Sequence, residues 1–358
     1  MSKAIDLFFF FGRPFSPIYS ALMKSREKLY HSGIFRQESL TVPVISIGNL
    51  VLGGTGKTPT VQHVAKLLSR HGYHPAVISR GYGGKAKKAV NIVSDGENIF
   101  LSPVLAGDEP HMLAKSLPGV PVLTGTRRIF PCRHSIEHFK TDVIILDDGF
   151  QHLTVKRDMD IVLFDSIALA GNSRVFPGGP LREPVSALNR CQAFLLTGQD
   201  KSNQERTKKF SDLLQQRFPD RPVFISALDS YKLLEPNVKN GENGKNGRIA
   251  EIIAQKKIFG FCGIANPSRF EKSLASLGIQ LAAFQALKDH SPYDQALISH
   301  LCKKAIECGA EGLVTTEKDF VKLKNFNLNF PLYVLQVQHK MDQSFDLFLL
   351  ESLKSFRK

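Results

Sequence analysis

Residues 53–58, with the sequence Gly-Gly-Thr-Gly-Lys-Thr, restrict the fold of this chain more than any other segment. They follow an apolar run at Val42–Ile47 and precede Thr60–Ser69, where apolar side chains recur at helical spacing. A glycine-rich loop between a strand and a helix points successive backbone N–H groups at phosphates. Its lysine reaches the β- and γ-phosphates and its threonine hydroxyl binds Mg²⁺. The residues that we expect to bind ATP are Val51, Leu52, Gly53, Gly54, Thr55, Gly56, Lys57 and Thr58.

One position departs from the generic P-loop pattern. That pattern opens with a glycine at the place that Val51 holds here. The strand, loop and helix otherwise follow in the order that the motif requires, so the prediction of a phosphate-binding loop stands.

Two acidic residues end a second apolar strand. Val143 to Leu146 is followed directly by Asp147 and Asp148. A carboxylate at this place holds Mg²⁺, directly or through water, so that the metal bridges the β- and γ-phosphate oxygens. We therefore expect Thr58, Asp147 and Asp148 to be the metal ligands.

Apolar segments of strand length alternate with helical patterns along the chain. This alternation predicts a mostly parallel sheet with helices on both faces, a P-loop α/β fold, and the length of the chain allows a second, smaller α/β domain. The other expected strands are Pro75–Ser79, Val120–Leu123, Val143–Leu146, Ile161–Phe164, Ala193–Leu196, Val223–Ile225, Ile258–Phe261 and Gly312–Val314.

The composition of two segments suggests where the domains divide. Arg174–Pro184 is rich in proline and glycine, so we place the junction near it. We expect an N-terminal segment at 1–35, a nucleotide-binding domain at 36–185, a second domain at 186–340 and a C-terminal helix at 341–358. Asn237–Gly247, rich in asparagine and glycine, reads as a surface loop.

The N-terminal segment is apolar and basic. The apolar run Leu7–Phe11 is much shorter than the roughly 20 residues that a membrane-spanning helix needs. Asp6 before it, and the lack of a cleavage site after it, argue against a signal peptide. Two structures remain open: a segment that lies in the bilayer interface, and a helix packed on the core.

The net charge of +14 indicates an anionic partner, which could be nucleic acid, a phosphorylated metabolite or an anionic membrane surface. The five cysteines have no metal-knuckle or redox spacing, which favours buried thiols in a reducing cytoplasm.

Several strings, taken in order, resemble the tetraacyldisaccharide 4'-kinase family of lipid A biosynthesis. A residue other than glycine at position 51 also fits that family. The strings are Gly48-Asn49, Gly53–Pro59, Ser79–Lys85, Ala106–Pro110, Asp147–His152, Pro177–Glu183, Asp289-His290 and Thr315–Asp319.

The resemblance implies an ATP-dependent phosphotransferase with an alcohol acceptor, the 4'-hydroxyl of a lipid-linked glucosamine disaccharide 1-phosphate. It implies two α/β domains joined by a short β linker, with the active site between them. It also implies peripheral binding to the anionic cytoplasmic face of the inner membrane. We expect ATP and Mg²⁺ as cofactors, and neither a nucleic acid nor an obligate protein partner.

The resemblance also implies roles for individual residues. Asp108 would be the base that accepts the hydroxyl proton, and His290 would orient the Asp108 carboxylate. Lys57 would stabilise the transferred phosphoryl group. Further candidates near substrate or phosphate are Arg80, Lys85, Arg127, Arg128, His152, Arg182 and Glu183.

Two other classes of protein remain alternatives. A P-loop GTPase or metallochaperone would be supported by an Asn-Lys-x-Asp motif or a Cys/His cluster, and the sequence has neither. A nucleic-acid-binding ATPase would need basic residues interleaved with aromatic ones, whereas the densest Phe cluster, at Phe8–Phe11, has no charge inside it.

Overall fold

The computed structural model describes residues 3–234, 253–264, 266–289, 291–323, 326, 328 and 330–356. These residues divide into two compact units, the first formed by residues 1–228 with 339–358 and the second by residues 229–338. His290 and the expected loop Asn237–Gly247 lie outside the described residues.

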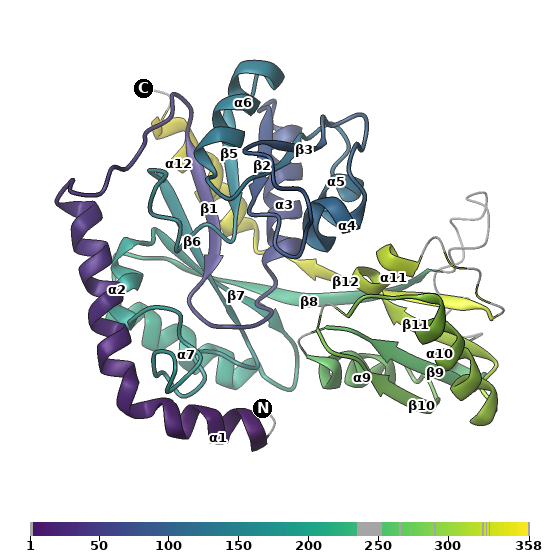
Figure 1. The fold of residues 1–358 in the computed structure, drawn as a ribbon. Coiled ribbons are helices and arrows are strands. Elements are labelled where there is room, and N and C mark those ends of the chain that lie inside the picture. The colour runs from purple at the N-terminus through teal and green to yellow at the C-terminus, as the bar shows by residue number, and fades with distance from the viewer. Residues whose placement is uncertain are drawn as a thin grey trace. The chain divides into compact units, whose positions relative to one another are not determined.

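The first unit is built around a mostly parallel sheet (Figure 1). Its strands lie in the order β8-β7-β6-β1-β5-β2-β4-β3, and β3 alone among these is antiparallel to its neighbour. The strands are β1 (Val44–Asn49), β2 (Pro75–Ser79), β3 (Asn91–Ser94), β4 (Val122–Thr124), β5 (Val143–Asp147), β6 (Met159–Asp165), β7 (Ala193–Gln199) and β8 (Val223–Leu234).

Helices cover both faces of this sheet because alternate side chains of its strands point to opposite sides. Ile45 and Ile47 pack in the core that α3, α5 and α12 close, whereas Val44 packs with α6 on the other face. Helix α7 covers that second face over β6 and β7. The helices are α3 (Lys57–Arg70), α4 (Pro103–Ala106), α5 (Asp108–Ser116), α6 (Ile129–Phe139), α7 (Gln204–Arg217) and α12 (Gln343–Phe356), with the 3-10 helix η2 (Val185–Arg190).

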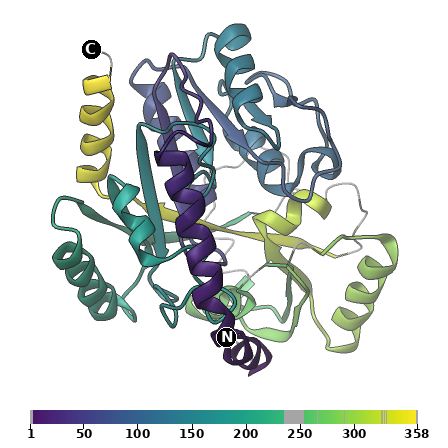
Figure 2. The same cartoon turned by 60° about the vertical axis from the view of Figure 1, so that its left-hand side comes forward.

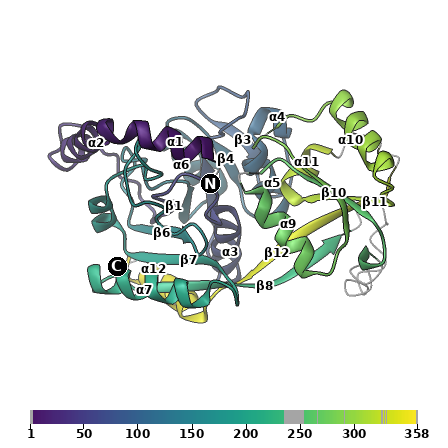
Figure 3. The same ribbon diagram turned by 90° about the horizontal axis from the view of Figure 1, so that it is seen from below.

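The N-terminal residues form two further helices of this unit, α1 (Lys3–Gly12) and α2 (Ser16–His31), joined by the 3-10 turn η1 (Arg13–Phe15). Figures 1 and 3 show both helices at the margin of the unit, outside the sheet, and in Figure 2 they pass in front of it. In the described part of the chain, no helix is both long enough and apolar enough to cross a bilayer.

The second unit has its own parallel strands, in the order β10-β9-β11-β12. Helix α9 packs on one face of them and α10 on the other. Strands β8 and β12 each run across the division between the units. The elements are β9 (Ile258–Cys262), α9 (Pro267–Ser276), β10 (Leu281–Ala286), α10 (Gln295–Glu307), β11 (Gly312–Thr316), α11 (Glu317–Leu323) and β12 (Leu332–Lys340).

The division between the units differs from the boundaries that we expected from sequence. We expected the second domain to begin at residue 186, but residues 193–199 form β7, which pairs with β6 of the first unit. The C-terminal helix belongs to the first unit as well. Phe345, Leu349 and Leu353 on one face of α12 are fully buried in its core, each contributing about 1.5–3 kcal/mol.

Candidate active site

Several expected site residues of the first unit lie where neighbouring parallel strands of its sheet end. The P-loop follows β1, and Asp147 is the last residue of β5, which pairs with β1 through Ile47 and Asp147. Residues 80–85 follow β2, which pairs with β5 on one side and with β4 on the other. Residues 125–128 follow β4. This edge, at the carboxyl ends of the strands, is where open α/β sheets bind ligands.

The backbone of the P-loop leaves helix N–H groups available to an anion. Gly56 precedes the first residue of α3 and has a φ of 73°, in the left-handed region that glycine tolerates best. Because Gly56 has no side chain, it caps none of the N–H groups in the first turn of α3. Lys57 and Thr58 lie in that turn, so both side chains begin at the phosphate-binding end of the helix.

Side chains from outside the loop hold it in shape. Asn49, which is fully buried, donates from Nδ2 to the carbonyl oxygens of Val51 at 2.7 Å and Gly53 at 3.4 Å. Thr197, at the end of β7, donates from Oγ1 to the carbonyl oxygen of Thr55 at 2.9 Å. Sequence reasoning assigned neither supporting residue, because a single asparagine or threonine carries no distinctive signal.

The structure gives a physical reason for valine at position 51. Val51 forms an antiparallel bridge with Leu181, and flanking hydrogen bonds run from Leu52 N to Pro180 O and from Arg182 N to Leu50 O, each of 2.8 Å. The Val51 side chain is buried beside Leu181 in an apolar cluster. An apolar residue is therefore needed where the generic motif has glycine.

Asp148 lies within an ion-pair cluster. Its Oδ1 is 3.7 Å from Nζ of Lys57, and Nη1 of Arg182 donates to Oδ1 and Oδ2 at 3.0 and 2.9 Å. The Asp148 backbone has a φ of 52°, and its carbonyl oxygen accepts from Nη1 of Arg128 at 2.9 Å. Burial alone would raise the pKa of Asp148, but Lys57 and Arg182 outweigh it and hold the pKa below its usual value. The group is thus a carboxylate at neutral pH.

Asp147 has the opposite electrostatic behaviour. It is 3% exposed, and burial, with the nearby carboxylates of Glu109 and Asp148, raises its pKa to about 7. Glu109 is a further acidic neighbour of the site that we assigned no role from sequence. Its position next to Asp108 at the start of α5 was the available signal.

The basic candidates divide by burial. Arg128 is 4% exposed, so it supports the Asp148 backbone rather than facing solvent, and burial lowers its pKa. Arg80 and Lys85 are exposed, and Arg127 stacks over the Phe130 ring, 5.0 Å from its centroid. Among the described basic candidates, Arg182 makes the closest contact with the Asp148 carboxylate.

Two polar candidates are engaged within the protein. Glu183 is buried and its carboxylate pairs with Arg190, so we find it in a salt bridge rather than facing an open site. A hydrogen bond of 2.7 Å joins Nε2 of His152 and Oγ1 of Thr154. Burial, with the charges of Arg128 and Arg157, lowers the pKa of His152 to about 3, so it is neutral at physiological pH.

Asp108 is the first residue of α5, directly after Gly107, whose φ of 94° disfavours any side chain. The loop after β2 lies against α4, the short helix that precedes Gly107. Lys85 N and Ala86 N donate to the α4 carbonyl oxygens of Val104 and Leu105, each at 3.0 Å. Asp108 is therefore close in the fold to the segment that carries Lys85. In the second unit, Asp289, which precedes His290, is 3.4 Å from Nζ of Lys318.

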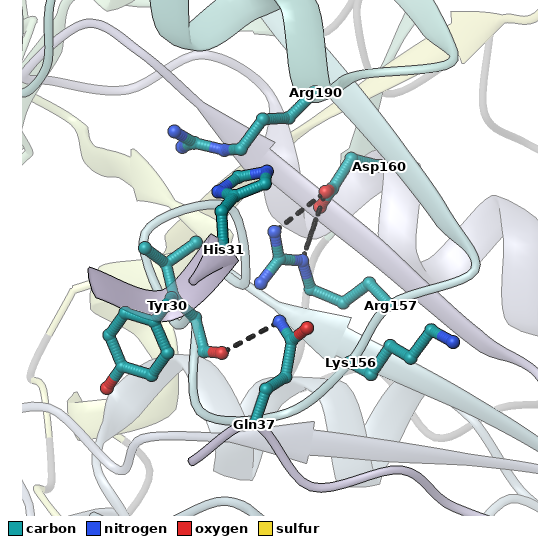
Figure 4. A pocket seen from close by; sticks show the side chains of 8 residues that line it. Tyr30, His31, Gln37, Lys156, Arg157, Asp160 and Arg190 are labelled. Atoms are coloured by element: carbon teal, nitrogen blue, oxygen red, sulfur yellow. Dashed lines mark hydrogen bonds and ion pairs between the residues drawn. The ribbon is translucent and has the colours of Figure 1, made fainter. Parts of the chain in front are cut away.

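A separate cavity of about 240 Å³ lies near the start of β6, away from the carboxyl ends of the strands (Figure 4). Its lining includes Tyr30 and His31 at the end of α2, and Arg157, Asp160 and Arg190. Arg157 is already paired with Asp160 through three hydrogen bonds of 2.9–3.0 Å. The cavity is therefore a seam between α2 and the sheet rather than the phosphate site.

A P-loop at the end of a central parallel strand, with carboxylates at the end of the neighbouring strand, defines the class of P-loop nucleotide-binding enzymes that act on phosphoryl groups. Residues 8–354 match the model of the family described as "Tetraacyldisaccharide-1-P 4'-kinase". The chain belongs to this family of kinases, and the kinase activity, the pathway of lipid A biosynthesis and the P-loop α/β fold expected from sequence are confirmed.

Individual relatives agree with the family match. The chain is 45% identical over 351 residues to the tetraacyldisaccharide 4'-kinase of Desulfotalea psychrophila, covering 98% of each chain. It is 40% identical to the enzyme of the same name from Syntrophus aciditrophicus, covering 95% of this chain and 92% of that one. The crystal structure of LpxK from Aquifex aeolicus in complex with ATP is similar with a TM-score of 0.70 and 28% identity, covering 95% of this chain and 98% of that one.

Proposed function

We propose that this protein transfers the γ-phosphoryl group of ATP to the 4'-hydroxyl of a tetraacylated glucosamine disaccharide 1-phosphate at a membrane surface. The observation that carries the proposal is the joint position of Lys57 and Asp148 beside the P-loop. The family match over nearly the whole chain supports the substrate.

The residues beside the P-loop fit ATP with Mg²⁺. Mg²⁺ is usually held by one or two carboxylates together with phosphate oxygens, rather than by a cage of protein ligands. Asp148, which is ionised, and the Thr58 hydroxyl would hold the metal, and Asp147 directly precedes Asp148 in the chain. Bound Mg²⁺ would neutralise charge that develops on the transferred phosphoryl group.

The cationic side chains of the protein would also stabilise negative charge on the transferred phosphoryl group. Lys57 would lie along the β- and γ-phosphates, and Arg182 keeps Asp148 in place while it does so. A lysine and an arginine that are fixed before the reaction stabilise developing negative charge without having to reorganise.

The acceptor hydroxyl must lose a proton as it attacks. We assign this proton to Asp108, by the family resemblance and because α5 starts beside the loop that follows β2. His290 would orient that carboxylate. Arg80, Arg127 and Lys85 are exposed cations that could meet the substrate's 1-phosphate.

The two N-terminal helices suit peripheral attachment to a bilayer. Phe9 is 8% exposed and packs inward, so part of α1 is seated on the protein. Many apolar side chains of the same segment face solvent with exposed fractions of 53–67%, and Arg13 lies among them. These are Leu7, Phe8, Phe10, Phe11, Phe15, Ile18 and Leu22. We therefore propose that the side of α1 that carries Phe9 packs on the protein, and that the exposed apolar side chains enter the interface of the cytoplasmic leaflet.

The experiment that tests this function is a transfer assay. The purified chain is incubated with radiolabelled ATP, Mg²⁺ and detergent-dispersed tetraacyldisaccharide 1-phosphate, with the Lys57→Ala variant as the control. We expect a labelled lipid from the wild type alone. Label released only as inorganic phosphate would contradict the kinase assignment for this chain.

A further inference from the structure

The Arg190 side chain lies between α2 and the two segments that carry Phe150 and Glu183. It is 9% exposed, and Nη1 lies 2.8 Å from Oε1 of Glu27 in α2. Its Nη2 pairs with Glu183, and its guanidinium carbon lies 4.6 Å from the centre of the Phe150 ring. One guanidinium therefore joins a helix at the margin of the unit to two segments of the phosphate site.

The Glu183 end of this contact leads to the metal-site carboxylate. Glu183 follows Arg182 directly, and Arg182 is held by its backbone N–H to Leu50 and by its side chain to Asp148. The Phe150 end leads to the same place, because Phe150 lies two residues after Asp148. Phe150 is fully buried against Gly48 of β1, where a Cβ atom would meet the Phe150 Cβ at 2.6 Å. The Phe150 branch is therefore closely packed, and the Glu183 branch is held by the hydrogen bond and ion pair of Arg182.

Other contacts join α2 to the same two segments. Nη2 of Arg26 donates to the carbonyl oxygen of Gln151 at 3.2 Å, and Nε2 of Gln151 donates to the carbonyl oxygen of Asn49 at 3.0 Å. At the other end of α2, Oγ of Ser16 donates to Val175 O at 2.7 Å and accepts from Gly178 N at 2.8 Å. Helix α2 is therefore anchored on the segments that carry Asp148 and Arg182.

We propose that Arg190 is a positioning residue that couples the seating of α2 to the geometry of the phosphate and metal site. This coupling depends on the proposed function in one respect, which is that the site binds Mg·ATP. A displacement of α2, through Glu27, shifts Arg190 and with it Glu183, Arg182 and Asp148. The seating of the membrane-facing helix pair and the affinity for Mg·ATP are linked by this contact.

Arginine is required at this position for a geometric reason. Its planar fork reaches two carboxylates at once and lies flat on an aromatic ring, whereas a lysine ammonium is a single point of charge. Burial alone would lower the pKa of Arg190, but Glu183 and Glu27 raise it further than burial lowers it, so the charge persists. Removing either carboxylate leaves part of a buried charge uncompensated.

The test measures Mg·ATP binding by the full chain in detergent micelles, with a fluorescent ATP analogue, for Arg190→Gln, Arg190→Lys and Glu27→Gln. We expect Arg190→Gln to weaken Mg·ATP binding by about tenfold or more and to raise the Mg²⁺ concentration at half-saturation. Arg190→Lys and Glu27→Gln should lie between this variant and the wild type. The matched control is Glu205→Gln, which removes a carboxylate from the exposed pair with Lys209 on α7 and should change neither quantity.

A merely structural role predicts a different result. Arg190→Gln would then lower the melting temperature and the active fraction, while the folded molecules bind Mg·ATP with wild-type affinity. That outcome, or wild-type Mg·ATP affinity in Glu27→Gln, overturns the proposal, and Glu27→Gln keeps the test decisive if Arg190→Gln does not fold. Because the readout is nucleotide binding, a failure of lipid phosphorylation would contradict the proposed function and not this coupling.

Discussion

Nζ of Lys57 lies 3.7 Å from Oδ1 of Asp148, although the two residues belong to different strand-and-helix units of the chain. The contact exists because β1 and β5 are parallel neighbours that end together, so the loop after one strand meets the residue after the other. It places side by side the cation that we propose for the phosphates and the carboxylate that we propose for the metal.

The first prediction is that Lys57→Ala abolishes phosphoryl transfer, with a loss of at least about a hundredfold in kcat/KM, because a phosphate-bound cation is removed. The free energy of unfolding should change little, since Asp148 keeps its pairing with Arg182. Transfer kinetics and urea unfolding check both statements. Near-normal turnover in folded Lys57→Ala protein would show that the loop does not bind the reacting nucleotide.

The second prediction concerns the metal. Asp148→Asn should raise the Mg²⁺ concentration at half-maximal activity by about tenfold or remove activity, because an amide is a poorer ligand for a hard cation. Asp212→Asn, which changes an exposed aspartate on α7, is the matched control. Identical Mg²⁺ titrations for both variants and the wild type would exclude Asp148 as a ligand.

The third prediction is a pH dependence of stability that arises at Asp147. Burial raises its pKa to about 7 from 3.8, so the folded chain holds this proton to higher pH than the unfolded chain does. The contribution of this proton to the free energy of unfolding is fully present below the ordinary pKa of 3.8. It falls by about 1.4 kcal/mol for each pH unit between the ordinary and the raised pKa, and is lost once the pH has risen through about 7. Asp147→Asn should remove this slope. Urea unfolding between about pH 5 and about pH 8 measures it, and an equal slope in wild type and variant would disprove the assignment.

The fourth prediction separates the membrane surface from the catalytic site. Phe11→Ser with Phe15→Ser, at side chains 67% and 60% exposed, should weaken binding to anionic vesicles by about tenfold or more. The KM for ATP, measured in detergent micelles, should stay unchanged, because neither residue lies in α2. Leu213→Ser with Leu347→Ser, at 54% and 60% exposed, removes similar apolar area elsewhere and should not alter vesicle binding. Cosedimentation with vesicles compares the two pairs. Equal binding by both would mean that α1 and its turn do not enter the bilayer.

The fifth prediction concerns proton transfer. If Asp108 and His290 act as one unit, each alanine variant should lose kcat heavily, and the double variant should be little worse than the poorer single one. The acidic limb of the pH–rate profile should shift in His290→Ala, with ATP affinity unchanged. Losses that simply multiply, with an unaltered acidic limb, would show that His290 positions substrate or structure instead.

Much of the first unit could be predicted from local sequence. The strand expected at Pro75–Ser79 has those bounds in the structure, and the helix expected at Thr60–Ser69 lies within α3. These patterns are readable because a parallel strand buried on both faces needs a continuous apolar run, and an amphipathic helix repeats every 3.6 residues. Strand β10, Leu281–Ala286, was not predicted because three of its six residues are alanines, which have low strand propensity, and it contains no β-branched residue.

The sequence by itself determined the phosphate loop, because turn geometry, a lysine and a threonine at fixed spacing are local requirements of phosphate binding. Only the tertiary structure decided that Glu183 is paired with Arg190, that Arg128 is buried and that β7 belongs to the first unit. Burial and ion pairing depend on segments far apart in the chain, as Glu27 and Arg190 are. Their positions follow from how the sheet and its helices pack, which no local pattern of residues encodes.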